Sequence, residues 1–335
     1  MPQPATELTS FVHNQPMNDF KIVVVEGAFA SSVALTLDIL STAAILAKRL
    51  GIAAPRWQVC GLSTDRVPLG QGMHIFLQPL VTDADDRSCW IIPGIGIADV
   101  ALIEQRLQQP DITSLVPALQ AHIRAGGTVA ASCSAVFVLQ AANVLVGRCV
   151  TTCWWMAPLL QQWASECQVD ADRMVISDPP LLTAGAALGH SDLMLQLLRS
   201  YFSPALADAV ARTLLIDARQ LQSPFMVPAM MAQGNELIAK LTSHIEASLP
   251  ATISVSTLAF DFGLSERTLS RHIHKATGHS PLRLIQRVQA NKARELLANS
   301  KYSVDTIAER VGYRDATSLR RLMKKMLNAT PRQLR

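Results

Sequence analysis

The segment from Ile253 to Pro331 carries the same short pattern twice, and this duplication constrains the fold more than any other feature of the sequence. In the first copy an apolar stretch, Val255–Ala259, is followed by Gly263 and by a restart at Ser265. The corresponding residues of the second copy are Val304–Ala308, Gly312 and Asp315. Each copy predicts a helix, a glycine-containing turn and a second helix capped by the Ser or Asp. The segment should therefore form a small all-α domain.

The second helix of each copy has an apolar face and a dense set of cations. Leu269 and Ile273 are four residues apart in the first copy, so they share one face. In the second copy the predicted buried stripe is Leu319, Leu322, Met323 and Met326, and the cations around it are Arg320, Arg321, Lys324 and Lys325. A long helix that begins with Pro281 and runs to about Ala298 is predicted between the copies.

The charge distribution indicates the partner of this segment. From Ala251 onward there are 16 Lys and Arg against 6 Asp and Glu, a net charge of +10, and the remainder has 14 against 20, a net charge of −6. A basic domain on a mildly acidic one is typical of a nucleic-acid-binding module attached to another domain. A solvated helical bundle is the alternative, but it would not explain why charge, turn glycines and duplication coincide.

These residues also resemble a known family. The first copy and the helix after it are similar to the first half of the AraC/XylS DNA-binding domain at Ser265, Arg267, Leu269, Arg271, Gly278, Ser280, Pro281, Ala293, Leu296 and Leu297. The second copy resembles its second half at Ile307, Ala308, Val311, Gly312, Tyr313, Ser318, Leu319, Arg321, Thr330 and Pro331. Gln289 departs from the family, which usually has Arg there, and Leu319 and Met323 stand where it usually has Phe. We expect these departures to alter packing rather than docking on DNA.

The resemblance implies that double-stranded DNA is the partner. Two recognition helices would enter successive major-groove segments on one DNA face, about 34 Å apart. The candidates for contacts with base edges are Arg267, Ser270, Arg271, Thr317, Arg320 and Arg321, because Arg pairs bidentately with guanine and hydroxyls bond bases less selectively. The candidates for contacts with phosphate are Lys275, Lys324 and Lys325.

The rest of the chain alternates short apolar stretches with helical ones. The predicted strands are Lys21–Val25, Trp57–Leu62, Cys89–Ile92, Thr128–Ala131, Met174–Ile176 and Leu181–Ala184. The predicted helices are Ser32–Leu50, about Ala98–Gln108, Ile112–Ala125, a stretch ending at Leu145, Ser191–Tyr201, Leu206–Ala218 and Asn235–Leu249. Such alternation predicts an α/β domain with a parallel sheet covered on both faces. A small-molecule site should lie at the carboxyl ends of its strands.

The corner Ala131–Ala135 has the form of a nucleophile elbow, in which a sharp strand-to-helix turn presents Cys133. The first amides of the next helix could bind an anion or lower the thiol pKa. The alternative is a cysteine that merely fills the core. All 6 cysteines lie in this part of the chain, without the paired spacing of a metal site, so no metal is predicted.

The surroundings of Cys133 resemble the PfpI-type branch of the class I glutamine-amidotransferase-like superfamily, which has a flavodoxin-like parallel sheet. The resemblance rests on Ile92–Gly94, Cys133, Leu145, Gly147, Arg148, Thr151–Trp154, Leu182–Gly185, Asp192 and Leu193. The chain joins this domain to an AraC-type segment, and in this combination it is similar to GlxA-type transcriptional regulators. The junction residues that also fit them are Ala207, Val210, Ala211 and Arg212. No cofactor is implied.

The departures from that superfamily argue against catalysis. Its enzymes need a base beside the elbow thiol, usually a His after a Thr-Thr pair, but Cys153 stands there. The stretch Gly27–Ser32 lacks the glutamate that many members place after the first strand. His190 is the other histidine expected near the site, with a role at a helix start. A cysteine hydrolase or deglycase fused to a DNA-binding domain is therefore the less favoured alternative.

We instead expect a small-molecule sensor. The resemblance implies a ligand pocket lined by Ser32, Gly94, Ile95, Cys133, Ser134, Cys153, Trp154 and His190. Relatives are thought to sense amino acids or quaternary amines, and Trp154 could stack on a cationic ligand or simply pack in the core. A thiol-based redox sensor is a second possibility, because Cys133 and Cys153 should face each other.

These features predict a ligand-controlled transcriptional regulator in the cytoplasm, dimeric through its first domain. By resemblance it would be an activator, with RNA polymerase as a further partner. No segment of about 18 uninterrupted apolar residues appears, so no membrane helix is predicted. The expected organisation is a flexible N-terminal tail over 1–18, a PfpI-like sensing domain over 19–202, a junction helix and linker over 203–234, and a DNA-binding domain over 235–335.

Overall fold

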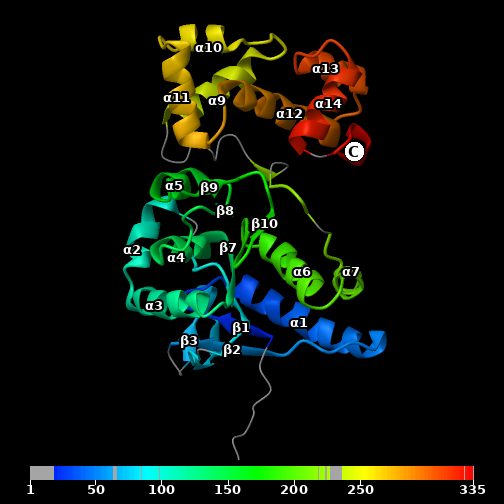
Figure 1. Ribbon diagram of the computed structural model, residues 1–335. Coiled ribbons are helices and arrows are strands. Elements are labelled where there is room, and N and C mark those ends of the chain that lie inside the picture. The colour runs from blue at the N-terminus through cyan, green and yellow to red at the C-terminus, as the bar shows by residue number, and fades with distance from the viewer. Residues whose placement is uncertain are drawn as a thin grey trace, which may run out of the picture.

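The computed structural model describes residues 19–62, 66–83, 85–97, 99–217, 219–222, 225–226, 236–327 and 329–334. The predicted tail over 1–18, the linker residues 223–224 and 227–234, and Asn235 at the predicted start of the DNA-binding domain lie outside them. An α/β domain lies below a helical domain in the view of Figure 1.

A seven-stranded sheet forms the centre of the α/β domain, in the order β10-β11-β7-β6-β1-β2-β5. Its strands are β1 (Phe20–Val23), β2 (Trp57–Gly61), β5 (Gln78–Pro79), β6 (Cys89–Ile92), β7 (Thr128–Ser132), β10 (Val175–Asp178) and β11 (Leu181–Ala184). All neighbours pair in parallel except β10 and β11, which are antiparallel. The predicted parallel, flavodoxin-like fold is confirmed, with the correction that one edge strand runs the other way.

Helices cover both faces of this sheet, as the alternation of strands and helices predicts (Figure 1). One layer contains α1 (Ala30–Leu50), α6 (Gly189–Tyr201) and α7 (Pro204–Thr213), which pack against one another. The other contains α2 (Ile103–Leu107), α3 (Pro110–Arg124), α4 (Val136–Ala141) and α5 (Ala157–Trp163). Between the layers the central strands are buried on both sides, which is why β6 reads as an unbroken apolar run.

Several elements differ from the sequence-based expectations. Two small pairs were not predicted, β3 (Arg66–Pro68) with β4 (His74–Phe76) and β8 (Cys149–Val150) with β9 (Gln168–Val169), because two or three residues show no alternation. The helix expected near 98–108 is a 3₁₀ turn, Val100–Leu102, followed by the short α2. The helices α4 and α7 end before Leu145 and Ala218, shortly before Asn143 and Leu215, which adopt positive φ angles of 54° and 54°.

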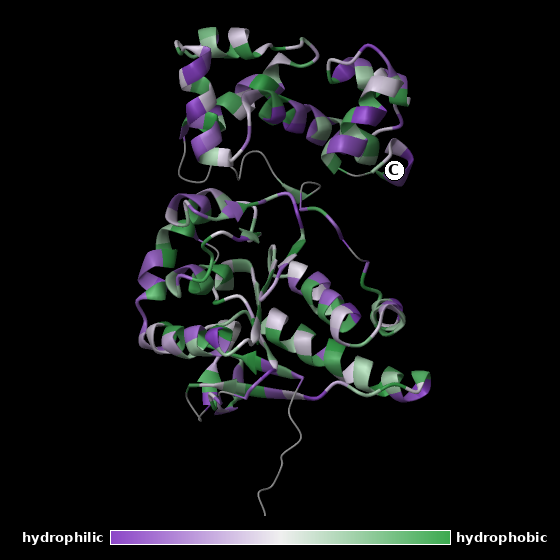
Figure 2. Ribbon diagram, in the orientation of Figure 1, coloured by the Kyte–Doolittle hydropathy of each residue, from purple (hydrophilic) through white to green (hydrophobic). Residues whose placement is uncertain are grey.

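The helix α1 is apolar over most of its length (Figure 2). Among the described residues it alone is long and apolar enough to cross a membrane, with a mean hydropathy of 1.7. It packs against α6 and α7, and its Ile39, Leu40 and Ala43 are fully buried. These contacts are those of a core helix in the α/β domain.

The C-terminal domain is all-α, as predicted. It contains α9 (Glu236–Ser248), α10 (Val255–Asp261), α11 (Glu266–Thr277), α12 (Pro281–Asn299), α13 (Val304–Arg310), α14 (Ala316–Leu327) and a terminal 3₁₀ turn (Pro331–Leu334). Its apolar side chains form two separate clusters, one around Leu269 and Ile273 and one around Leu319 and Met323. The helix α12 contributes Leu284 to the first and Leu297 to the second, so it is the shared spine of both units.

The turn residues have the predicted roles. Gly263 and Gly312 adopt φ angles of 64° and 87°, in the left-handed region that favours glycine. The Ser265 hydroxyl accepts a hydrogen bond from the Thr268 amide at 3.2 Å. The Asp315 carboxylate accepts one from the Ser318 amide at 2.7 Å. Both units are therefore closed by a glycine turn and an N-cap.

Candidate DNA interface and regulatory site

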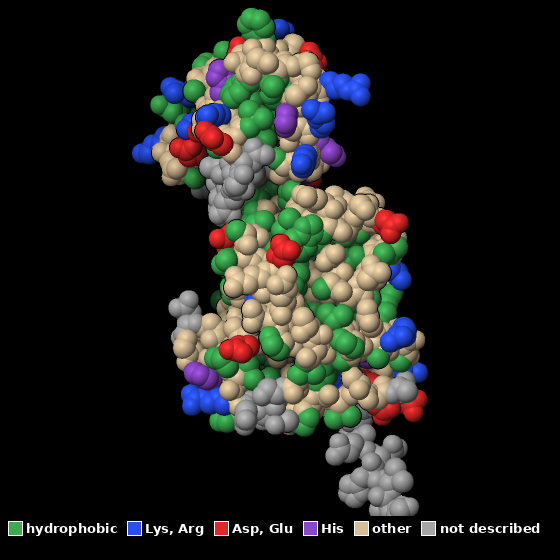
Figure 3. All heavy atoms as spheres, turned by 90° about the vertical axis from the view of Figure 1, so that its left-hand side faces the viewer, with side chains coloured by type: hydrophobic (Ala, Val, Ile, Leu, Met, Phe, Trp, Pro, Cys, Tyr) green, Lys and Arg blue, Asp and Glu red, His purple; other side chains and the backbone are tan. Residues whose placement is uncertain are grey.

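The two predicted recognition helices are α11 and α14, and each presents its cations to solvent. Arg267, Arg271, Lys275, Thr317, Arg320, Arg321, Lys324 and Lys325 are exposed, and Ser270 is half-buried. The apolar residues predicted to lie beneath them, such as Leu269 and Met323, are fully buried. On the face shown in Figure 3, Lys and Arg side chains project from the C-terminal domain. The domain can therefore offer a cationic surface to phosphate and bases.

The helix α12 sets the separation of the two recognition helices, because α11 and α14 pack near its opposite ends (Figure 1). It has 19 residues, which corresponds to roughly 28 Å of helix. Successive major-groove segments on one DNA face are about 34 Å apart. A helix of this length suits two recognition helices that would contact bases in adjacent helical turns of the DNA major groove.

Gln289 connects α12 to the second unit, a role that the sequence did not reveal. Its side chain is 3% exposed. The amide nitrogen donates to the Val311 carbonyl at 3.1 Å, and the amide oxygen accepts from the Tyr313 hydroxyl at 3.3 Å. At this position the departure from the family therefore takes part in packing between α12 and the second unit.

The elbow is present at Cys133. This residue follows β7 directly and adopts a φ of 58°, a strained conformation for a residue with a side chain. Its amide donates to the Gly185 carbonyl at 3.0 Å. The loop after β6 approaches so closely that a Cβ at Gly94 would lie 3.2 Å from the Cβ of Cys133. The backbone thus holds the thiol at the carboxyl end of the sheet, as predicted.

Cys153 faces Cys133 across the elbow, with 3.0 Å between the two sulfur atoms. The hydrogen bond from Cys153 lowers the pKa of the Cys133 thiol, whereas burial raises the pKa of Cys153 well above its usual value. Both side chains are almost fully buried, at 2% and 0% exposed. Cys133 is therefore the thiol of the pair that ionises first.

His190 lies beside the elbow but bonds to hydroxyl groups. Its Nε2 is 2.6 Å from the Thr36 hydroxyl and its Nδ1 is 2.8 Å from the Ser132 hydroxyl. Burial lowers its pKa to about 4, so the ring is neutral at pH 7. Because both ring nitrogens are engaged, the imidazole positions the backbone around Cys133 and is not aimed at its sulfur.

The eight predicted pocket residues come together, but they form a closed site. All of them are buried, and Trp154 is the most exposed side chain among them at 7%. The Ile95 amide donates to the Ser134 hydroxyl at 3.2 Å, which ties the β6 loop to the elbow. Trp154 packs edge-to-face on Trp155, with ring centroids 5.2 Å apart. A ligand could enter only if some of these side chains moved.

Gln222 covers the elbow from a distant part of the sequence. Its amide nitrogen donates to the Thr152 carbonyl at 2.8 Å and to the Thr151 hydroxyl at 3.1 Å, and its amide oxygen accepts from the Trp154 amide at 3.3 Å. A Cβ at Gly185 would lie 2.4 Å from this side chain, so only glycine fits there. Gln222 is not predicted from the sequence as a residue of this site, because it follows the junction helix and lies 70 residues from Thr152.

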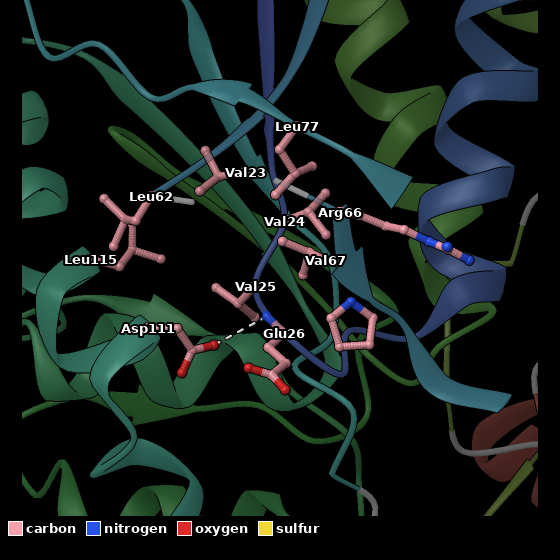
Figure 4. Close-up of a pocket in the computed structure, with 11 residues that line it drawn as sticks. Val23, Val24, Val25, Glu26, Leu62, Arg66, Val67, Leu77, Asp111 and Leu115 are labelled. Carbon is pink, nitrogen blue, oxygen red and sulfur yellow. Dashed lines mark hydrogen bonds between the residues drawn. The ribbon is translucent and has the colours of Figure 1, made fainter. Parts of the chain in front are cut away.

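A cavity of about 180 Å³ lies elsewhere, between β1, the β3–β4 hairpin and α3 (Figure 4). Its walls are mainly aliphatic, with Val25, Val67 and Leu115 among them, and Glu26 and Asp111 lie at its edge. None of the eight predicted pocket residues lines it. Asp111 is bonded to both terminal nitrogens of Arg106 at 2.8 Å, so its charge is already neutralised.

Comparisons with known proteins agree with this two-domain organisation. Residues 258–335 match the family described as "Helix-turn-helix domain". The transcriptional activator RhaS of Salmonella arizonae is 36% identical over 104 residues, which are 31% of this chain and 36% of that protein. The chain thus spans about a third of the length of the curated relatives it matches.

Among solved structures, an AraC family transcriptional regulator from Pseudomonas putida has a TM-score of 0.50 and 18% identity, covering 59% of this chain and 100% of that one. A ThiJ/PfpI family protein from Pseudomonas syringae has a TM-score of 0.49 and 15% identity, covering 72% of this chain and 94% of that one.

The C-terminal domain contains the helix-turn-helix domain that the family model matches, and both helix-turn-helix units are present in it. The N-terminal domain has a flavodoxin-like fold, which it shares with the solved regulator from Pseudomonas putida. An α/β domain joined to a helix-turn-helix domain is the combination that the resemblance to GlxA-type regulators predicts.

Proposed function

We propose that this protein is a sequence-specific DNA-binding transcriptional regulator of the cytoplasm. The observation that carries the proposal is the pair of exposed cationic helices, α11 and α14, mounted near the two ends of the shared helix α12. One protein can then contact two major-groove segments with a fixed spacing. The name of the relative RhaS supports activation, in which case RNA polymerase is a further partner. Pairing of two α/β domains would place four such helices on a symmetric operator.

Arginine replacement on the two recognition helices tests this proposal. A duplex selected by the wild-type protein from a random-sequence pool serves as the operator. Arg271→Ala and Arg321→Ala should each weaken binding by about 1–3 kcal/mol if each side chain pairs with a base. The matched control is Arg49→Ala, which removes one exposed cation from the end of α1 in the other domain. Equal affinity of all four proteins would contradict the assignment of α11 and α14.

We further propose that the α/β domain is a small-molecule sensor rather than an enzyme, with the ligand site at the eight residues around Cys133. The engaged imidazole of His190 and the presence of Cys153 favour binding over catalysis. The indole of Trp154 favours a cationic ligand such as a quaternary amine or an amino acid. Because the site is closed, the ligand would select a minor, open state.

A thermal-shift measurement on the full chain tests the ligand class. Choline should raise the melting temperature, and its neutral isostere 3,3-dimethyl-1-butanol should raise it less, because only the former gains the cation–π attraction. L-amino acids form the second arm. Trp154→Leu should abolish the difference between choline and the isostere. Equal shifts from both compounds in the wild-type protein would argue against a quaternary amine.

The short distance between Cys133 and Cys153 favours a redox sensor as the second candidate. Peroxide would oxidise the two thiols to a disulfide and be reduced to two molecules of water. Non-reducing mass spectrometry after peroxide treatment should then find a crosslink between these residues, and none in Cys153→Ser. Burial of both sulfur atoms opposes this reaction, so intact thiols under conditions that oxidise exposed cysteines would eliminate the candidate.

A further inference from the structure

We propose that Gln222 and Asp172 form an interdomain latch, which holds the DNA-binding domain against the sensor domain and is released when the elbow opens. The latch presupposes the regulatory function proposed above and specifies how the two domains are coupled. It consists of a continuous set of hydrogen bonds and ion pairs between the elbow and α12. The docked arrangement is the state of low DNA affinity.

The first part of the latch is a strip of backbone that joins Gln222 to Asp172. The backbone amide of Gln222 donates to the backbone carbonyl of Asp172 at 2.7 Å. The backbone amide of Met174 donates to the backbone carbonyl of Gln220 at 3.0 Å. Arg173 and Leu221 form an antiparallel bridge between these bonds. The two short segments therefore move as one, and the Gln222 side chain fixes them to the elbow through Thr151, Thr152 and the Trp154 amide.

The second part is an ion-pair cluster that crosses to the DNA-binding domain. One carboxylate oxygen of Asp172 is 2.8 Å from an Arg287 nitrogen, and the other bonds to Arg283. The Arg287 side chain is only 2% exposed and that of Asp172 is 17% exposed. Breaking a buried pair by neutralising one partner is strongly destabilising, because it leaves an uncompensated charge. The domain contact thus depends on the Asp172 charge.

A third contact reinforces the same face of α12. The Asn291 side-chain amide donates to the Met226 carbonyl at 3.0 Å, and the Arg287 guanidinium also touches the Met226 sulfur. Met226 is 1% exposed and lies four residues after Gln222 in the sequence. The chain that leaves the elbow is therefore held to α12 at a second point.

The position of these contacts explains why they would affect DNA binding. Since α12 belongs to the apolar clusters of both helix-turn-helix units, its docking fixes the whole domain. In the docked arrangement the recognition helix α11 packs against α5 of the sensor domain. The α11 cations stay exposed in this arrangement, but α5 restricts how duplex DNA can lie along the helix, so an undocked domain should bind more tightly. A ligand that displaces Gln222 or Trp154 would favour the undocked state.

Four proteins test the latch as full-length chains: wild type, Asp172→Asn, Gln222→Met and the double variant. Asp172→Asn keeps the side-chain shape but leaves Arg283 and Arg287 without their counter-charge. Gln222→Met keeps the volume and removes the amide. The control is Asp208→Asn, which removes one negative charge and an exposed pair with Arg199 in the same domain. Asp208→Asn and Asp172→Asn have the same net charge. Comparing the two therefore removes any gain in DNA affinity that comes from the loss of a negative charge alone.

The readouts are the dissociation constant for a random-sequence 40-base-pair duplex at low salt and the radius of gyration from small-angle X-ray scattering. Asp172→Asn should bind about five-fold tighter than Asp208→Asn, Gln222→Met should bind about five-fold tighter than wild type, and both should have a larger radius. The double variant should gain no more than either single variant, because one release suffices. Circular dichroism at the assay temperature must show that Gln222→Met is folded; if it is not, Gln222→Glu replaces it.

The decisive comparison is the Gln222 variant, since that side chain bonds within the sensor domain. If Asp172→Asn releases the domain but a folded Gln222 variant behaves like wild type, the coupling to the elbow is wrong. Equal affinity and equal radius in all proteins would overturn the latch while leaving DNA binding intact. Failure of the wild-type protein to bind any duplex would instead overturn the proposed function.

Discussion

The side chain opposite Cys133 decides what chemistry the elbow can perform. A histidine there would accept a proton from the thiol, whereas the thiol of Cys153 only donates a hydrogen bond to it. The nearby His190 is neutral and bonded to Thr36 and Ser132. The backbone corner of a nucleophile site is thus present, while the side chains around it are engaged in hydrogen bonds with one another.

The buried state of His190 makes the stability of the α/β domain dependent on pH. Its pKa is about 4 in the folded protein against 6.5 for the unperturbed group, so the unfolded state binds more protons between these values. Stability is therefore fully retained above about pH 6.5 and is lost as the pH falls towards 4. The His190 contribution to this loss should approach about 1.4 kcal/mol per pH unit.

Chemical denaturation of the wild-type protein and His190→Gln between pH 7 and 4.5 measures this effect. Glutamine can still bond to the two hydroxyls but cannot be protonated in this range, so its curve should fall less steeply. His279 also has a pKa lowered to about 4, and it contributes equally to both proteins. Parallel curves would mean that His190 is not the titrating group.

At the scale of elements, α12 joins two helix-turn-helix units that have separate cores. Gln289 makes one of its connections, because it bonds to the Val311 carbonyl and the Tyr313 hydroxyl in the turn of the second unit. Its neighbour Gln286 bonds only to the exposed side chain of Lys325 among the contacts described. The same substitution at these two glutamines of one helix therefore compares a residue that bonds to the second unit with one that does not bond to its turn.

Gln289→Leu should lower the free energy of unfolding by about 1–3 kcal/mol, because it leaves a buried carbonyl and a hydroxyl without a partner. Gln286→Leu should change it by less than about 0.5 kcal/mol, as is usual for surface substitutions. Urea denaturation of the full chain, followed by circular dichroism at 222 nm, distinguishes them. A similar loss in both variants would show that the gain in hydrophobicity, rather than the lost bonds, is responsible.

At the scale of the whole molecule, charge and core are divided between the two domains. The segment from Ala251 onward has a net charge of +10, whereas the rest has −6. The apolar cluster around Leu319 and Met323 in the C-terminal domain is small, so this domain can present most of its cations to solvent. Its DNA affinity should consequently depend strongly on counterion release.

The proposed contacts include seven cations: Arg267, Arg271, Lys275, Arg320, Arg321, Lys324 and Lys325. If all of them neutralise phosphates or lie against the duplex, the logarithm of the association constant should fall with the logarithm of the salt concentration with a slope of about −6. Fluorescence anisotropy from 50 to 300 mM salt gives the slope, and Lys325→Ala should reduce its magnitude by about 0.9. A slope near zero would show that these side chains do not face DNA.

The sequence by itself determined the features that depend on local order. Turn glycines, N-caps and helical periodicity act within a few residues, so they located Gly263, Ser265, Gly312 and Asp315 correctly. The alternation of apolar strands with helices likewise predicted a sheet covered on both faces. The small-residue corner at Ala131–Ala135 indicated the elbow for the same reason.

Only the tertiary structure decided how the sites are closed and connected. Gln222 reaches the elbow from 70 residues away, and Arg283 meets Asp172 across 111 residues. Neither contact leaves a periodic or compositional signal, because a single polar side chain at the end of a loop looks the same whether it is exposed or buried. The direction of β10 and the two-residue strands also could not be predicted from the sequence, because they depend on the strand that each pairs with rather than on local preference. Packing thus converts isolated polar residues into a closed elbow and an interdomain contact.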